Sequence, residues 1–195
     1  SFMVDTIPPD LNSFTMDDID IKIGDTSVIT LVFSEEICPN ISSCLVVSER
    51  FTRSDITVPT TDSGVSVGAN TPLTTLATSD NVTWTTSFTP RTGIEDDTNY
   101  LFLDNTTYTD LAGNVGAADN QTANFLVDTL GPVVNQFTMS DRHLKSGDNA
   151  TVTIVFSETV LGFNSDDDIT IPNIDRGPGQ GRASGTLATM TSTDN

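Results

Sequence analysis

The sequence is poor in basic residues and in histidine. Lysine and arginine together number 8 against 27 aspartates and glutamates, which gives a formal net charge of −19. A field of this sign repels nucleic acid and anionic membrane surfaces, so neither is an expected partner. The only histidine is His143, so a catalytic arrangement that uses a histidine base has one candidate residue.

Long apolar runs are also missing. No stretch approaches the ~20 apolar residues that a membrane-spanning helix needs, and no secretory signal pattern is present. We therefore expect no membrane insertion by this segment. The missing signal says little about export, because the chain is expected to open in the middle of a repeated unit.

The residues that are abundant favour strands and turns over helices. Of the 27 acidic residues, 22 are aspartate, which favours turns and helix caps, whereas glutamate is the common acid of helix surfaces. Threonine, serine, asparagine and glycine make up much of the remainder. Divalent cations are the natural counter-ions of such a chain.

One segment of the sequence occurs twice. Residues 1–9, SFMVDTIPP, recur as residues 124–132, NFLVDTLGP, at an offset of 128 − 5 = 123 residues. The same offset carries the tetrapeptide Val-Phe-Ser-Glu of residues 32–35 onto residues 155–158. Repetition at one fixed spacing indicates a tandem array.

The repeat predicts three segments. Residues 1–5 end the last strand of a preceding module, and residues 6–128 form a complete module with an insertion at 37–50. Residues 129–195 form the N-terminal part of a second module, whose last three strands are expected to be missing.

Short alternating segments predict about seven strands per module. Residues 82–89 show the pattern most clearly, because Val82, Trp84, Thr86 and Phe88 alternate with smaller polar residues. Seven short strands separated by turns favour a two-sheet sandwich. The expected strands span residues 11–16, 28–33, 55–58, 73–78, 82–89, 99–103 and 123–127.

Several motifs carry a family resemblance. The strings Asp-Thr-x-x-Pro, Val-Phe-Ser-Glu, Asp-Ile-Thr-Val-Pro and Tyr-Thr-Asp-Leu-Ala-Gly-Asn resemble the bacterial Ig-like repeats of giant surface adhesins. The resemblance implies an all-β chain of tandem Ig-like β-sandwich modules, with Ca²⁺ at the module junctions. It further implies a non-enzymatic, extracellular spacer of a cell-surface adhesin or filament. Its expected partners are neighbouring modules of the same polypeptide and neighbouring chains in a filament.

The acids expected to bind calcium fall at the two poles of an Ig-like module. Calcium takes about six to eight oxygen ligands from carboxylates, amides and carbonyls. The expected ligands at the N-terminal pole are Asp5, Glu35, Asp110 and Asn114. Those at the C-terminal pole and the following junction are Asp25, Asp96, Asp97, Asp128 and Glu158. The alternative is that these residues form turns and carry solvated charges.

Two cysteines lie six residues apart in the insertion. Cys38 and Cys44 are expected to form a disulfide, because the loop offers too few other ligands for a metal site. The insertion and the loop of residues 176–182, which carries two arginines, are the candidate segments for an alternative function. That function is a ligand- or glycan-binding adhesive module.

Two further motifs occur in the sequence. Gly64–Gly68 fits the Gly-x-Ser-x-Gly spacing of hydrolases, but no helix pattern follows it and His143 lies in the other repeat. No enzymatic activity is therefore expected. Candidate N-glycosylation sequons begin at Asn40, Asn81, Asn105, Asn120 and Asn149.

Overall fold

The computed structural model describes residues 4–39, 51–61, 64–171, 187–189 and 192. The chain divides into two compact units, Ser1–Leu130 (unit 1) and Gly131–Asn195 (unit 2). Within the described part of the chain, no helix is long and apolar enough to cross a membrane.

Unit 1 is built from strands, with two single-turn 3-10 helices between them. Its first strands are β1 (Leu11–Met16), β2 (Asp20–Lys22), β3 (Ser27–Phe33), β4 (Ile56–Thr57), β5 (Gly68–Leu73) and β6 (Ala77–Thr78). Those that follow are β7 (Thr83–Pro90), β8 (Glu95–Asn99), β9 (Phe102–Leu103), β10 (Asn120–Gln121) and β11 (Phe125–Asp128). The 3-10 turns are η1 (Arg53–Asp55) and η2 (Asn105–Thr107).

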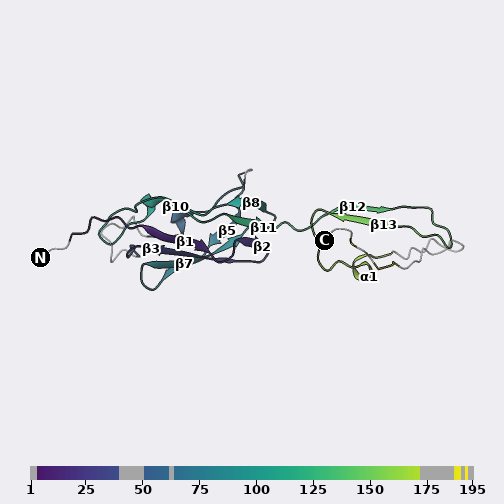
Figure 1. Ribbon diagram of the computed structural model, residues 1–195, viewed down its shortest axis with the longest axis horizontal. Helices are drawn as coiled ribbons and strands as arrows, with labels where there is room; N and C mark the ends of the chain where they lie inside the picture. Colours follow the sequence, from purple (N-terminus) through teal and green to yellow (C-terminus); the bar gives the residue numbers. More distant parts are fainter. Residues whose placement is uncertain (1–3, 40–50, 62–63, 172–186, 190–191, 193–195) are drawn as a thin grey trace. The chain divides into compact units, whose positions relative to one another are not determined.

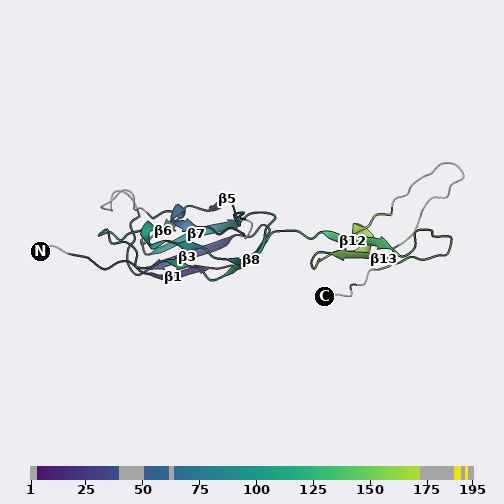
Figure 2. The same cartoon turned by 90° about the horizontal axis from the view of Figure 1, so that it is seen from above.

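The strands of unit 1 form three sheets. The largest has the order β1-β3-β7-β5, with β6 also paired to β7, and Figure 2 shows β6, β7, β3 and β1 side by side. The other two sheets have the orders β10-β9-β4 and β2-β11-β8. In Figure 1, β8 and β10 lie across the unit from β3 and β7. This is the expected all-β, Ig-like sandwich.

The core consists of apolar side chains that alternate with more exposed residues along the strands. Ile29, Leu31 and Phe33 of β3 are at most 1% exposed, whereas the residues between them point outward. Burying one face of each strand is the main stabilising contribution for such a sheet. At one end of the core, Phe33 packs on Phe51 and Tyr108, with ring centroids 5.5 and 5.1 Å away.

The prediction of a single strand over residues 99–103 is wrong. The chain leaves the β8 sheet at Asn99 and enters the β9 sheet at Phe102. Asn99 ends β8 because its side chain donates to the carbonyls of Asp96 and Phe125, at 3.0 and 3.1 Å. Leu101 is fully buried between the two strands. The apolar pattern of these residues therefore did not indicate that the chain crosses from one sheet to another.

The strand expected over residues 73–78 is also interrupted. The structure ends β5 at Leu73 and starts β6 at Ala77. Thr74 stays bound to β7 between the two strands, because its amide donates to the carbonyl of Ser87 at 3.0 Å and its carbonyl accepts from the Thr86 hydroxyl at 2.8 Å.

Unit 2 contains a two-stranded antiparallel sheet, β12 (Val134–Met139) with β13 (Val152–Phe156), and a single helical turn, α1 (Ser165–Asp168). The register of this sheet repeats that of β1 and β3. Val134 pairs with Phe156 as Leu11 pairs with Phe33, and both pairs are followed by the same irregularity.

The turn that follows the first strand is repeated as well. Gly24 and Gly147 both adopt a positive φ, of 89° and 94°, which glycine adopts at no steric cost. The Asp25 carboxylate accepts from the Lys22 amide at 3.0 Å, and Asp148 accepts from Lys145 at 2.9 Å. The offset of 123 residues therefore holds in the hydrogen bonding as well as in the sequence.

Candidate functional site

Three carboxylates from distant parts of the chain meet at the N-terminal pole of unit 1. One oxygen each from Asp5, Glu35 and Asp110 lie within 4.8 Å of one another. Asp5 belongs to the segment before β1, Glu35 follows β3, and Asp110 precedes β10. The structure thus brings together three of the four residues predicted for this pole, and Asn114 contacts the group.

Backbone contacts place Asp5 and Glu35 next to each other. The amide of Ser34 donates to the carbonyl of Asp10 at 2.8 Å, which ties the end of β3 to the segment before β1. The amide of Ala117 donates to the carbonyl of Pro9 at 2.9 Å and holds the same segment against the loop after η2. The Asp5 carboxylate accepts from the Ile7 amide at 3.1 Å.

Asp110 is the buried member of the group. It is 2% exposed, and its two carboxylate oxygens accept from the backbone and side-chain nitrogens of Asn114, at 2.8 and 2.7 Å. Gly113, with a φ of 92°, lets the chain turn back on itself at this point. The Asp-Leu-Ala-Gly-Asn loop therefore fixes Asp110 locally.

Asn114 links the loop to the segment before β1. Its side-chain nitrogen donates to the Asp5 carbonyl at 3.3 Å as well as to Asp110. In this orientation the amide presents a hydrogen-bond donor to the group, so Asn114 positions the Asp110 carboxylate.

The negative charges of the three grouped carboxylates repel one another. Burial, followed by the negative charges of Asp110 and Asp5, raises the pKa of Glu35 above its ordinary value. Without a cation, Glu35 thus ionises less readily than an exposed glutamate. A divalent cation among the three oxygens would remove the repulsion, and hard oxygen ligands of this kind suit Ca²⁺.

The acids predicted for the C-terminal pole lie on the sheet β2-β11-β8 and its turns. Asp128 pairs with Lys22 of β2 and with Glu95 of β8, and Asp25 caps the turn after β2. Asp96 accepts from the Thr98 amide at 3.0 Å, and Asp97 accepts from the Thr98 hydroxyl at 3.1 Å.

No close group of three acids occurs at that pole among the residues the structure describes, where Asp5, Glu35 and Asp110 are the only such group. Glu158 lies in unit 2 at the position equivalent to Glu35. Calcium binding by Asp25, Asp96, Asp97, Asp128 and Glu158 stays a prediction.

The predicted disulfide and sequons are partly outside the described residues. Cys38 is fully buried, while Cys44 and Asn40 lie in the segment 40–50, so the disulfide stays a prediction. The loop of residues 176–182 also lies outside the described residues.

The remaining sequons differ in accessibility. Asn149 is exposed, whereas the side-chain nitrogens of Asn105 and Asn120 donate to the carbonyls of Gly116 and Ala118, at 3.0 and 2.9 Å. Asn81 has a positive φ of 58°. Glycosylation at these positions stays a prediction.

Sequence reasoning missed one contributor to this pole. The Asn81 carbonyl accepts from the amide of Ile37 at 2.8 Å and from the indole of Trp84 at 3.0 Å. It thereby holds the chain after Glu35 in place. The sequence carries no signal for this role, because the contact is made by the backbone.

Comparison with known families agrees with this architecture. The family profile described as "Bacterial Ig-like domain" matches residues 5–127, more than half of the chain. The chain therefore belongs to the bacterial Ig-like domain family. No curated protein and no solved structure matches it.

Family membership defines the class of protein. Domains of this family are typically non-enzymatic, structural or adhesin-type modules, and they are commonly extracellular or at the cell surface. The match begins at Asp5 and so includes the three grouped carboxylates.

Proposed function

We propose that the chain is a non-enzymatic extracellular spacer of a cell-surface adhesin or filament, and that calcium at the ends of its Ig-like modules stiffens it. The observation that carries this proposal is the meeting of Asp5, Glu35 and Asp110 within 4.8 Å. Its natural partners are neighbouring modules of the same polypeptide and neighbouring chains in a filament.

The origin of the three carboxylates explains how calcium would act. Asp5 lies in the segment of unit 1 that precedes β1, whereas Glu35 and Asp110 belong to the body of the sandwich. A cation shared by all three would tie the leading segment to the sandwich and reduce its freedom to bend. Waters and backbone carbonyls would supply the further oxygens that calcium requires.

The repeated sheet supports a role as a spacer. The pairing of β12 with β13 reproduces that of β1 with β3 residue for residue. An array of such modules is extended along one direction, because each repeat contacts only its neighbours. The alternative of a ligand- or glycan-binding module depends on the insertion at 37–50 and on the loop of residues 176–182. Residues 40–50 and 176–182 lie outside the described residues.

Calcium should stabilise unit 1 through this group. We expect calcium to raise the melting temperature of the chain over that in chelator, because ligand binding to the folded state stabilises it. Differential scanning calorimetry with and without calcium measures the effect. Glu35→Gln should remove most of the calcium-dependent shift, since it replaces one of the three carboxylates.

Glu36→Gln is the matched control. Glu36 is the exposed neighbour of Glu35 and does not belong to the group, so the variant should keep the shift. Identical melting curves in calcium and in chelator for the native chain would rule out the calcium part of the proposal. Equal calcium shifts in both variants would place the binding elsewhere.

A further inference from the structure

An arginine without an acidic partner lies beside a cavity in unit 1. The chain holds 27 acidic residues, yet the only ion pair among the residues that the structure describes joins Lys22 and Asp20. The guanidinium of Arg53 donates instead, through Nη1, to the carbonyl of Leu73 at 3.0 Å. This contact holds a positive charge against β5.

The cavity beside Arg53 lies where two sheets of the sandwich end. It has a volume of about 240 Å³, and its walls are formed by η1, by β5 and by the segment of β4. β4 is the last strand of the sheet β10-β9-β4, and β5 is the last strand of the sheet β1-β3-β7-β5. The cavity therefore opens at the side of unit 1, between the edges of two sheets.

The lining combines an apolar floor with polar groups at the rim. Ile56 and Leu73 are buried, at 4% and 3% exposed, whereas Arg53, Ser54 and Asn70 are exposed. None of the lining residues is acidic. A guanidinium, a hydroxyl and an amide beside an apolar floor suit a carboxylate that carries an apolar group.

The neighbouring acid, Asp55, is bound to another residue. Its carboxylate accepts from the amide of Thr52 at 2.6 Å and from the hydroxyl of Thr52 at 3.2 Å. These bonds cap η1, and Asp55 is not part of the cavity lining. The guanidinium is therefore the one charged group in the wall of the cavity.

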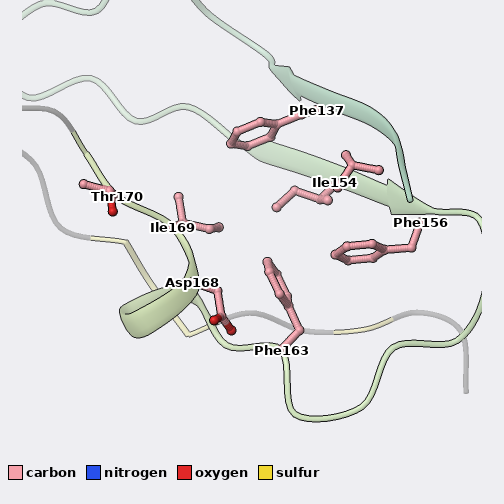
Figure 3. A pocket seen from close by; sticks show the side chains of 8 residues that line it. Phe137, Ile154, Phe156, Phe163, Asp168, Ile169 and Thr170 are labelled. Atoms are coloured by element: carbon pink, nitrogen blue, oxygen red, sulfur yellow. The ribbon is translucent and has the colours of Figure 1, made fainter. Parts of the chain in front are cut away.

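The second repeat has acids where the first has this arginine. Residues 55–59, DITVP, recur as residues 168–172, DITIP, but the preceding segment 163–168 contains three aspartates and no basic residue. The cavity that this segment lines in unit 2 has Asp168 in its wall, beside the aromatic rings in Figure 3. A carboxylate would be repelled there, so charge restricts an anion site to unit 1.

We propose that the cavity beside Arg53 binds an aliphatic carboxylate, either free or at the C-terminus of a peptide. The carboxylate accepts hydrogen bonds from the guanidinium, and the aliphatic group lies over Ile56 and Leu73. A cavity of about 150 Å³ is large enough for benzene, so this one accommodates a branched aliphatic side chain. The site shares no residue with the group of Asp5, Glu35 and Asp110 and goes beyond the role as a spacer.

The net charge of the chain is compatible with an anion at this place. Charges in water are screened beyond about 8 Å at physiological ionic strength, so the guanidinium in the wall outweighs the distant acids. A charged hydrogen bond to a carboxylate is also stronger than a neutral one. Binding should therefore depend on Arg53 and on the charge of the ligand.

Titration of the isotope-labelled chain with N-acetyl-leucine, followed by NMR after removal of calcium, tests the proposal. The amide signals of Ser54, Ile56 and Asn70 should shift together and saturably. N-acetyl-leucinamide lacks the charge and N-acetylglycine lacks the apolar group, so each should bind at least about tenfold more weakly. A tripeptide ending in leucine that binds more tightly than N-acetyl-leucine would assign the site to peptide C-termini, and equal binding would assign it to free carboxylates.

Three variants of the chain locate the site. Arg53→Gln should lower the affinity for N-acetyl-leucine at least about tenfold, because it removes the charged donor. Arg91→Gln is the matched control and should keep the affinity, since Arg91 is an exposed arginine outside the cavity lining. Arg53 also ties η1 to β5, so Asn70→Asp supplies a second variant at an exposed position. Its added negative charge at the rim should weaken binding without loss of the fold.

Four results would overturn the proposal. They are no saturable shift of the three cavity amides, equal affinity for N-acetyl-leucine and N-acetyl-leucinamide, equal affinity of the native and Asn70→Asp chains, and equal losses in Arg53→Gln and Arg91→Gln. The last result would mean that the overall charge of the chain, and not the cavity, governs the binding of the anion.

Discussion

At the scale of single residues, the three grouped acids differ in burial. Asp110 is almost fully buried and Glu35 half-buried, whereas Asp5 is exposed. The pKa of Glu35 is raised by burial first and by the two neighbouring carboxylates second. Elsewhere in the core, burial raises the pKa of Tyr108 to about 12, so its phenol stays neutral.

The raised pKa of Glu35 predicts a pH dependence of stability in chelator. The folded chain holds the Glu35 proton to a higher pH than the unfolded chain does, so the stability associated with Glu35 is present at low pH. It is lost as pH rises from the ordinary pKa through the raised one. The free energy of unfolding of the native chain should therefore fall relative to that of Glu35→Gln across this window.

Denaturation in urea at a series of pH values measures this difference. Saturating calcium should abolish the loss, because the cation takes the place of the proton. A difference between the two chains that stays constant with pH in chelator would contradict the prediction.

At the scale of elements, the end of β11 is tied to the connection between β7 and β8. The buried Thr129 hydroxyl donates to the carbonyl of Arg91 at 2.6 Å and accepts from the amide of Ile94 at 3.0 Å. Its backbone amide donates to the carbonyl of Ile94 at 2.7 Å. One threonine thus closes the C-terminal end of the sandwich.

Replacing this threonine should destabilise unit 1. Thr129→Val leaves the Ile94 amide without its acceptor in a buried place, which should cost about 1–3 kcal/mol of unfolding free energy. Chemical denaturation followed by tryptophan fluorescence reports unit 1, because Trp84 is the only tryptophan of the chain.

The repeat supplies the matched control. Thr6 is the equivalent of Thr129 at the offset of 123 residues and is exposed, so Thr6→Val should change the unfolding free energy by less than about 0.5 kcal/mol. Equal effects of the two substitutions would mean that the buried hydrogen bonds contribute nothing specific.

At the scale of the whole molecule, the two units share a backbone pattern but differ in how much of it they bury. The inward residues of β3 are at most 1% exposed, whereas those of β13 are half-buried. Packing of an apolar face contributes most of the stability of a sheet, so equal pairing does not imply equal stability.

Hydrogen exchange should separate the two sheets. We expect the amides of β13 to exchange faster than their equivalents in β3, because opening of β13 exposes little additional apolar surface. Mass spectrometry of peptides covering residues 27–33 and 152–156 compares them directly. Equal protection would mean that unit 2 is stabilised by packing that its exposed residues do not indicate.

The sequence by itself determined the class of fold and the repeat. Alternation over residues 82–89 predicted β7, and the shared motifs predicted matching strand pairs 123 residues apart, because side-chain periodicity is a local property. It also predicted the group of Asp5, Glu35 and Asp110, since an Ig-like topology brings these loops to one pole.

Only the tertiary structure decided the features that depend on long-range contacts. Asn99 ends β8 by bonding to the Phe125 carbonyl, and β2 pairs in parallel with β11, which no local pattern encodes. Phe14 and Phe137 are the same residue type in the same register, yet one is buried and the other exposed. Burial depends on the segments packed against a residue, and these lie far away in the sequence.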